Sequence, residues 1–451
     1  MLRNIIALLI LVSAVQAEPT TVTLDEGLQM AFDRNEVLRA ARGDVDRART
    51  FVREALGDGL PQVRAAATYN RNWKLRTSVL DGENGPTRVT FGTKKNVNSN
   101  ITLRQSLFAG GGVVAQWKES RNFERAAHQS LREIRQAVHA DVETAFYDLL
   151  LAKELVAVSD LALDRARRNQ KQVQLLRDAG RASRFDLLRA EVQVLELRPD
   201  SIRASRDLKL ADITFKNVIG LNPSAEVELD GDFRDTSNVA MTDPESMIDT
   251  GFGSRPDRLR QTHRLAARRQ GIKIEQAGRL PSLDFVATAQ FQIQKDEFDF
   301  SSDDIRRSWF TGLSLSLPIF DGLKTRAAIS RARIDYRRTE LETENLEREI
   351  RLDIYTAWLS WREAVDRLDA QARATALTAE GLRAAEAQYA EGLATQLEVT
   401  DAQLSLLRAE TEYARARRDR AVAIVELERS VGLLGETAAT DQQQSKTGDT
   451  L

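Results

Sequence analysis

Two very long stretches of the chain repeat apolar residues at spacings of three and four, the pattern of helices that pack as in a coiled coil. In the first stretch these positions are Ile134, Val138, Val142, Ala145, Leu149, Ala152 and Val156. The pattern predicts unbroken helices over 111–178 and 323–390. At about 1.5 Å per residue each would be about 100 Å long, far more than a globular core requires.

Four shorter segments alternate apolar and polar residues, which indicates β-strands with one face of each kind. They predict two hairpins, over 62–107 and 282–319. Strands of about 10 to 13 residues exceed the usual soluble strand and suit a tilted membrane strand. Two hairpins cannot close a barrel alone, so we expect other copies of the chain to pair with their open edges.

Each long helix ends at a glycine, and the chain then turns back into a further helix. In "GRASRFD" the turn glycine is Gly180, Ser183 is a good N-cap, and Asp186 is the acid of a capping box. The segment "GLATQLE" repeats this motif with Gly392, Thr395 and Glu398. The returning helices are predicted over 183–219 and 395–431, and Pro199 should kink the first or end it early.

These reversals belong to an internal duplication. Gly180 and Gly392 are 212 residues apart, as are Gly220 and Gly432, and no gap is needed between them. The pattern predicts a first repeat over 18–220, a connector over 221–250, and a second repeat over 251–434.

Both repeats are expected to open with a capping box before a short helix. The boxes are Thr23 with Glu26 and Thr242 with Glu245. In the first repeat, helices are predicted near 24–34 and 36–57. The polar tail 435–451 is expected to be disordered.

The first 17 residues, "MLRNIIALLILVSAVQA", read as a secretory signal, because their apolar core is too short to span a bilayer. We therefore expect export to a bacterial periplasm or outer membrane. The net charge of −2 gives no basic field for nucleic acid. The chain has no cysteine and three scattered histidines, so thiol chemistry and a metal cluster are not expected. No catalytic constellation or cofactor motif is evident, and we expect no enzyme activity and no cofactor.

Together with the duplication, the segment "LPIFDG" before a long helix and the motif at both reversals resemble the TolC-like outer membrane efflux protein family. The resemblance implies a mainly α fold with membrane β-structure. Three subunits would share one 12-stranded barrel, four strands from each chain, continued by a coiled-coil tunnel in the periplasm. It implies a passive exit duct for efflux or type I secretion in the outer membrane, working with a periplasmic adaptor and an inner-membrane pump and gated at the periplasmic helix tips.

The same resemblance assigns residues at the reversals. The implied pore constriction comprises Glu398 and Asp401, with Asp186 and Arg189 at the matching places of the first turn. For Glu398, helix capping alone is an equally good explanation. Arg189 can pair with a neighbouring acid or lie in solvent. The implied adaptor-docking tips are Gly180, Arg181, Ser183, Gly392, Leu393 and Thr395.

Two other classes of protein remain as alternatives. A periplasmic adaptor is also exported and rich in helical hairpins, but it predicts soluble strands. A secreted enzyme could use paired carboxylates, yet carboxylates are so frequent on these helices that a chance pair is uninformative. The sequence does not specify the cargo, the pump or the adaptor.

Overall fold

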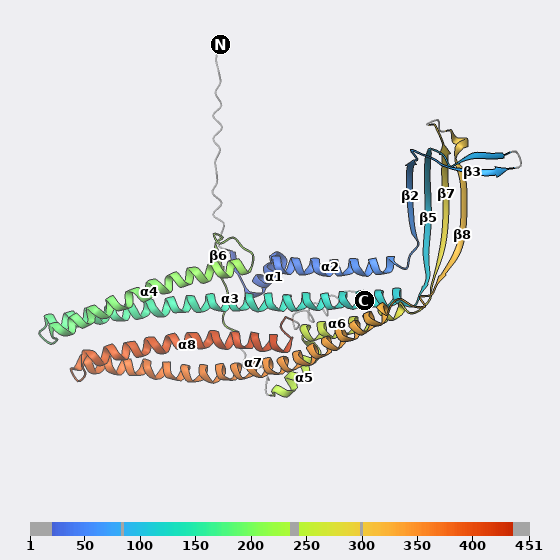
Figure 1. Cartoon of the computed structure of the whole chain (residues 1–451). Coiled ribbons are helices and arrows are strands. Elements are labelled where there is room, and N and C mark those ends of the chain that lie inside the picture. The colour runs from blue at the N-terminus through green and yellow to red at the C-terminus, as the bar shows by residue number, and fades with distance from the viewer. Residues whose placement is uncertain (1–19, 83–84, 235–242, 298–300, 436–451) are drawn as a thin grey trace, which may run out of the picture. The chain divides into compact units, whose positions relative to one another are not determined.

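The computed structural model describes residues 20–82, 85–234, 243–297 and 301–435, coloured in Figure 1. The predicted signal segment and all but the first residue of the predicted tail lie outside this part. The chain divides into two compact units. We call residues up to 41, 131–256 and from 347 onward the helical unit, and residues 42–130 and 257–346 the sheet unit.

The sheet unit contains one antiparallel sheet of four strands in the order β2-β5-β7-β8. The strands are β2 (Gln62–Arg71), β5 (Lys95–Ala109), β7 (Ser282–Lys295) and β8 (Arg306–Ser316). Because β5 pairs with β7, strands from the two sequence repeats form a single sheet. Among the described residues, β2 and β8 each have one neighbour, so both edges of the sheet are open.

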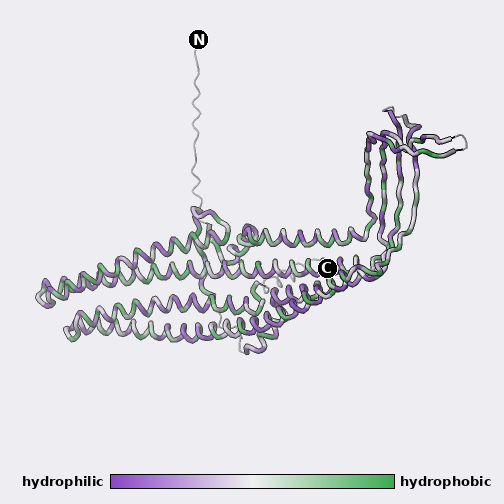
Figure 2. Tube along the Cα trace, in the orientation of Figure 1, coloured by the Kyte–Doolittle hydropathy of each residue, from purple (hydrophilic) through white to green (hydrophobic). Residues whose placement is uncertain are grey.

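The register places the predicted apolar residues of all four strands on one face. Val63 lies opposite Leu103, and Leu283 lies opposite Leu315. Phe285 lies opposite Leu313 in the same way. Figure 2 colours the strands by hydropathy and shows apolar and polar residues interspersed along them. A break in the register between Ser106 and Phe108 leaves Leu107 out of the ladder, as in a β-bulge.

The first hairpin is more elaborate than the sequence predicted. Its connection carries a second pair of strands, β3 (Arg76–Gly82) and β4 (Gly85–Phe91), which form a separate two-stranded ribbon. In the second hairpin, β8 ends at Ser316 rather than 319, and its connection holds a short 3-10 helix, η1 (Ser302–Asp304). The sequences of β3 and β4 are too short for their residue pattern to distinguish these strands from a loop.

Wherever the sequence predicted the bounds of a helix, that helix begins and ends within one residue of the prediction. They are α1 (Leu24–Arg34), α2 (Glu36–Gly57), α3 (Gly112–Asp178), α4 (Arg184–Val218), α5 (Pro244–Ser254), α6 (Pro256–Ala277), α7 (Lys324–Glu391) and α8 (Gln396–Val431). Among the described helices, none has both the length and the apolar character that a membrane crossing requires.

One capping box is present as predicted and the other is not. Thr23 and Glu26 cap α1 reciprocally. Asp243 caps α5, accepting hydrogen bonds from the backbone N–H groups of Glu245 and Ser246 at 3.2 Å. The predicted cap Thr242 lies outside the described residues. An aspartate before a proline at the first helical position serves equally well, which explains the shift by one residue.

Of the two outcomes expected for Pro199, a kink or an early end of the helix, the early end was wrong, because α4 continues through Pro199. Pro199 removes the hydrogen bond to the carbonyl group of Leu195. Leu195 is exposed, so water can satisfy that carbonyl. Two residues before the proline, Leu197 packs against Leu163 and Ala166 of α3. Tertiary packing on that side holds the helix together despite the lost bond.

The helical unit has its main core where α1, α3, α4 and α8 meet. Phe146 of α3 lies edge-on to Phe215 of α4, with ring centroids 5.9 Å apart, and both are fully buried. A parallel pair of short strands, β1 (Thr20–Val22) and β6 (Val227–Leu229), brings the start of the chain and the predicted connector against this core. The connector is therefore a structural part of the helical unit.

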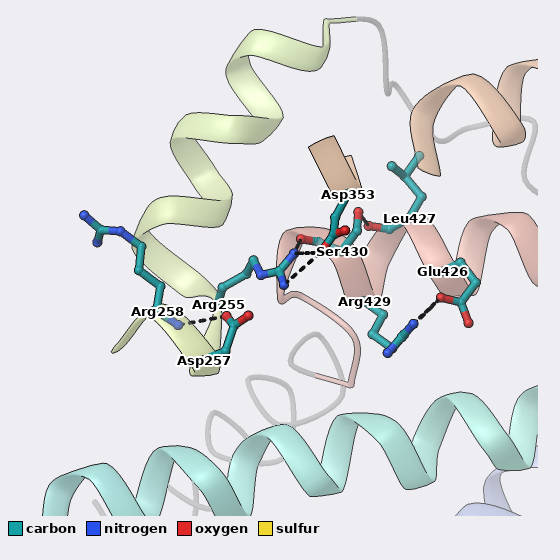
Figure 3. A network of polar contacts seen from close by, with 8 residues as sticks. All are labelled: Arg255, Asp257, Arg258, Asp353, Glu426, Leu427, Arg429 and Ser430. Carbon is teal, nitrogen blue, oxygen red and sulfur yellow. Dashed lines mark hydrogen bonds and ion pairs between the residues drawn. The ribbon is translucent and has the colours of Figure 1, made fainter. Parts of the chain in front are cut away.

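The end of α8 is fixed by polar contacts with the end of α5, and Arg255 at that end also reaches Asp353 of α7 (Figure 3). The Arg255 guanidinium donates to the carbonyl oxygen of Ser430 at 3.0 Å and forms an ion pair with Asp353 at 3.3 Å. The Ser254 hydroxyl donates to the carbonyl oxygen of Val431 at 2.5 Å. These bonds satisfy the last carbonyl groups of α8, which have no partner within the helix.

Candidate functional site

The first helix reversal joins α3 to α4 through a left-handed glycine. Gly180 has φ of +75°, and its N–H donates to the carbonyl oxygen of Arg177 at 2.8 Å. The N–H of Arg181 donates to the carbonyl oxygen of Leu176, also at 2.8 Å, which completes a Schellman motif. A side chain would be strained at this φ, and this is the physical reason for the glycine.

The cap that follows is reciprocal. The backbone N–H of Asp186 donates to the Ser183 hydroxyl at 3.1 Å, and the N–H of Ser183 donates to the Asp186 carboxylate at 3.0 Å. Asp186 therefore has a defined structural role at the start of α4. A carboxylate here also interacts favourably with the positive end of the helix dipole.

The second reversal, between α7 and α8, has the same construction. Gly392 has φ of +80°, and the N–H of Leu393 donates to the carbonyl oxygen of Gln388 at 2.8 Å. The N–H of Thr395 donates to the Glu398 carboxylate at 2.6 Å, and the N–H of Glu398 donates back to the Thr395 hydroxyl at 3.4 Å. Glu398 is thus a capping residue in this chain, whatever further role it has.

The two reversals contact one another within the helical unit. Tyr389, near the end of α7, packs against a small buried cluster of Val173, Leu187 and Ala190. Burial and, after it, the Asp186 carboxylate raise the pKa of the Tyr389 phenol. The Arg181 guanidinium reaches the carbonyl oxygen of Ala390 at 3.5 Å. The tips of both helical hairpins therefore form one local structure.

The four candidate constriction residues occupy different environments. Asp401 is exposed on α8, one turn beyond Glu398, and has no capping role. The guanidinium of Arg189 lies over the ring of Phe185, 5.1 Å from its centroid. This cation-π contact is a third arrangement, different from the ion pair and the solvated position considered above. Among the described residues, no hydrogen bond or ion pair joins Asp186 or Arg189 to the two acids of α8.

The residues expected at the docking tips are exposed. Gly180, Arg181, Ser183, Gly392, Leu393 and Thr395 all lie at the surface of the single chain. Leu393, one of these predicted residues, has an exposed fraction of 75%. The sequence reasoning missed two apolar residues nearby, Phe185 and Leu397, which are 64% and 46% exposed. The tips thus present large apolar side chains next to polar turns.

A buried group of polar residues just behind the tips was also missed. We call Gln193 of α4 with Gln396, Thr400 and Gln403 of α8 the polar layer. The Gln193 amide donates to the side-chain oxygen of Gln403 at 2.9 Å, and the Thr400 hydroxyl donates to that of Gln193 at 3.4 Å. Both side-chain polar atoms of Gln396 lack a partner among the described residues, although Gln396 is only 2% exposed.

A sequence signal for the polar layer existed. Gln193 lies three residues after the buried Ala190 and four before Leu197, which is the spacing of an apolar seam. Gln403 lies in the same way between Val399 and Leu406. Polar residues at seam positions were therefore visible, but the sequence did not show that the two glutamines face each other.

A groove of about 500 Å³ runs beside α3, α7 and α8 behind the tips. Arg165, Arg168 and Arg383 line it together with Glu386 and Tyr389. Two hydrogen bonds, of 2.9 and 2.8 Å, connect the Arg165 guanidinium to the Glu410 carboxylate, and they raise the pKa of this arginine. This forked pair links α3 to α8.

The arrangement defines a class of protein. Two long helical hairpins, each ending in a capped reversal, accompany an open antiparallel sheet with one continuous apolar face, as in a channel subunit of the bacterial outer membrane. The model of the family described as outer membrane efflux protein matches residues 27–221 and 252–433. The chain belongs to this family, which confirms the predicted resemblance and the outer-membrane location.

Individual relatives agree with the family match. Outer membrane protein OprJ of Pseudomonas aeruginosa is 26% identical over 423 residues, covering 90% of this chain and 83% of OprJ. The proteases secretion protein PrtF of Dickeya chrysanthemi is 23% identical over 429 residues, covering 93% of this chain and 88% of PrtF. None of these comparisons supports the periplasmic adaptor considered as an alternative.

A solved structure shares the fold. The outer-membrane channel OprN aligns with a TM-score of 0.76 and 21% identity, covering 91% of this chain and 89% of that chain. The predicted fold class, helical hairpins joined to a membrane β-domain, is therefore confirmed. In a single chain the four strands form an open sheet rather than a closed barrel.

Proposed function

We propose that three copies of this chain form a gated, passive exit duct through the outer membrane. The observation that carries the proposal is the open sheet of the sheet unit, which has one apolar face across four strands and two unpaired edges. A bilayer does not tolerate open sheet edges, because their N–H and C=O groups would have no partner. Copies of the chain must then pair edge to edge until the ring closes.

The number of strands favours three copies. Two copies would give a barrel of about eight strands, whose interior is filled by side chains. Three copies give about twelve strands and leave room for a passage. The polar face of the sheet would line that passage, with the apolar face against lipid.

The long helices form the periplasmic part of the duct in this proposal. Their seams bury apolar residues on one side, and the remaining faces are highly charged, as suits walls in contact with water. The duct itself supplies no energy, so an inner-membrane pump drives transport and a periplasmic adaptor connects the two. The relative PrtF is named for protease secretion, which supports a polypeptide as one class of cargo beside small molecules.

The helix reversals form the periplasmic entrance, and Asp401 is the principal constriction residue. It is exposed and free of a capping role, whereas Glu398 holds the start of α8. Three copies would place a ring of Asp401 and Glu398 carboxylates at the entrance, which favours cations. The adaptor would dock on the exposed Leu393 and Phe185, because large apolar side chains beside polar turns are typical of interaction sites.

Single-channel recording in a planar bilayer tests the proposal. We expect wild-type protein to form discrete, cation-selective channels, and Asp401→Asn to shift the reversal potential in a potassium chloride gradient toward zero. Glu398→Gln should do the same to a smaller extent and also loosen the start of α8. The matched control is Glu412→Gln, an exposed acid further along α8.

Two outcomes would contradict the proposal at different levels. No channel activity from correctly extracted protein would contradict the duct itself. Channels whose selectivity is unchanged by Asp401→Asn, or changed equally by Glu412→Gln, would leave the duct intact and remove Asp401 from the constriction.

A further inference from the structure

The apolar face of the sheet ends in a row of three basic residues. Arg71 of β2 lies opposite Lys95 of β5, and Lys95 lies opposite Lys295 of β7. Two residues earlier on the same face, Tyr69 lies opposite Val97, so the basic row directly follows the apolar rows. Like charges opposite one another destabilise a sheet unless a counter-charge is present.

The position of the row along the strand is informative. From Val63 to Arg71 the strand advances eight residues, which is about 27 Å of strand, or about 20 Å of height at a tilt of about 40°. The apolar band of outer-membrane proteins is about 25 Å tall. If the apolar face meets lipid, the basic row lies at the level of the lipid headgroups. It is at the end of the sheet that carries the hairpin connections, opposite to α2 and α3.

Further basic residues gather at this end of the sheet. The stretch 71–95 contains six basic residues and two acidic ones, Asp81 and Glu83. Its exposed basic side chains are Arg71, Lys74, Arg76, Arg88 and Lys94. On the opposite edge of the sheet, Arg307 of β8 lies opposite Phe291 and so shares the apolar face, two residue pairs of that face from the basic row.

Acidic residues at the same end compensate only part of this charge. The Asp296 carboxylate accepts a hydrogen bond from the backbone N–H of Lys94 at 2.8 Å, and Asp304 forms an ion pair with Lys295. Glu297 and Asp303 are exposed in the same connection. The Arg71 guanidinium lies over the ring of Trp73, 4.0 Å from the centroid.

Aromatic side chains complete the pattern of an interfacial surface. Trp73 is 82% exposed and Trp309 is 80% exposed. Trp309 lies on the apolar face, opposite Ala289 and three residue pairs of that face from the basic row. Tryptophan and tyrosine are enriched at both membrane interfaces, where the ring meets apolar chains and its polar atom meets water.

We call the surface formed by Arg71, Lys95, Lys295 and Arg307 the basic belt. We propose that the basic belt binds the phosphate groups of a phosphorylated glycolipid in the outer leaflet. The inference rests on the proposed function, because it requires the apolar face to lie in lipid. Arginine is well suited to phosphate, to which it donates two parallel hydrogen bonds. Charge complementarity favours this occupant, since the belt has a net positive charge at the level of anionic headgroups and an apolar surface below it.

The proposed assembly strengthens the argument. When sheets join edge to edge, β8 of one copy meets β2 of the next, which brings the edge carrying Arg307 beside the edge carrying Arg71. At a stagger that brings Arg307 level with Arg71, each of the three joints gathers like charges that an anion can neutralise. A lipid phosphate at each joint would neutralise them and hold neighbouring copies together.

Native mass spectrometry of the full-length protein in detergent tests the proposal, because it counts both chains and bound lipids. The probes are diphosphorylated lipid A and the same lipid after removal of both phosphates. We expect the wild-type three-chain species to bind the phosphorylated lipid preferentially. The double variant Arg71→Gln, Arg307→Gln should bind it about thirtyfold more weakly, from the contribution of two surface arginines.

The matched control is Arg64→Gln. Arg64 is an exposed arginine on the same strand as Arg71, but it belongs to the polar face of the sheet. This variant should bind lipid as the wild type does. Equal binding of both lipids, or wild-type affinity in the double variant, would overturn the proposal. So would a double variant that falls apart into single chains without any lipid, since the arginines would then bind acids of a second copy.

The proposal and the duct fail in distinguishable ways. A three-chain species without preference for phosphate overturns the lipid site and leaves the duct intact. Phosphate-dependent binding by protein that never forms three-chain species supports the basic belt and overturns the proposed assembly.

Discussion

Single residues decide where the long helices stop and how closely backbones approach. The reversal motifs use a glycine, a hydroxyl and a carboxylate in the same order twice, and each capping pair forms the expected hydrogen bonds. All of this is local, since each bond joins residues within five positions of one another. Other glycines are required because a distant segment of the chain lies close to their backbone. Substituting such glycines distinguishes the effect of backbone strain from the effect of this close approach.

Gly110, between β5 and α3, is expected to tolerate no side chain. Its φ is +59°, and an added Cβ would lie 2.7 Å from the carbonyl oxygen of Ala277 and 2.8 Å from Cβ of Leu280. We expect Gly110→Ala to lower the free energy of unfolding by about 2–5 kcal/mol, from backbone strain and overpacking together. The readout is the temperature at which the detergent-solubilised assembly dissociates.

The neighbouring Gly111 provides the control. Its φ is +78°, yet nothing lies within 4 Å of an added Cβ. Gly111→Ala should therefore cost only the strain, about 1–2 kcal/mol. Equal losses in the two variants would show that the close approach to Ala277 contributes nothing.

At the scale of elements, the seams between helices combine apolar packing with a few buried polar residues. The polar layer connects α4 and α8 behind the tips, and part of its hydrogen-bonding capacity is unused among the described residues. A partly satisfied buried network is less stable than an apolar seam. Such a weak point is a physical basis for separation of the hairpins at the entrance.

A double-mutant cycle tests the polar layer. Gln193→Leu alone leaves the side-chain oxygen of Gln403 without its partner, whereas the Thr400 hydroxyl keeps its hydrogen bond to the carbonyl oxygen of Gln396 at 3.0 Å. The variant should therefore destabilise the tips by about 1–3 kcal/mol. The double variant Gln193→Leu, Gln403→Leu removes both glutamines and should recover most of that loss. Amide hydrogen exchange at the starts of α4 and α8 measures the effect.

The control for this cycle is Gln388→Leu, an exposed glutamine on α7. It should leave exchange at the tips unchanged. If the single and double variants are equally destabilised, the two glutamines do not act together, and the polar layer has no role in opening.

At the scale of the whole molecule, neither edge of the sheet can be satisfied by the chain itself. The pairing of β8 from one copy with β2 of the next is a head-to-tail contact, which must close into a ring or continue without limit. The absence of natural cysteine makes this geometry accessible to cross-linking.

We expect a variant with one cysteine on each edge to cross-link into species of up to three chains and no larger. Suitable positions are Thr311 on β8, combined in turn with Ala65 and Ala67 on β2, because the stagger of the joint is not set by one chain. Oxidation of intact membranes followed by denaturing electrophoresis gives the result. Two-chain species alone, or a ladder beyond three, would contradict the trimer.

The corresponding single-cysteine variants serve as controls. In a closed head-to-tail ring, a cysteine on β2 alone meets no second cysteine at the joint. Cross-links formed by Ala65→Cys alone would therefore indicate a contact between equal edges, which is inconsistent with the proposed ring.

The sequence by itself determined the features that depend on neighbouring residues. The boundaries of the long helices, the capped reversals and the alternating strands follow from local hydrogen bonding and from periodicity, which the chain carries without reference to distant segments. The duplication was equally visible, because it is a property of the sequence alone. The alternation of apolar and polar residues also predicted which apolar residues share a face within each hairpin.

Only the tertiary structure decided what distant segments do to one another. It joined β5 to β7, paired β1 with β6, and placed Gln193 against Gln403. It also carried α4 through Pro199, since packing beside the proline outweighs the local preference. These outcomes depend on contacts across many residues, whose free energy no local pattern encodes. The row of Arg71, Lys95 and Lys295 likewise exists only once the register of three strands is fixed.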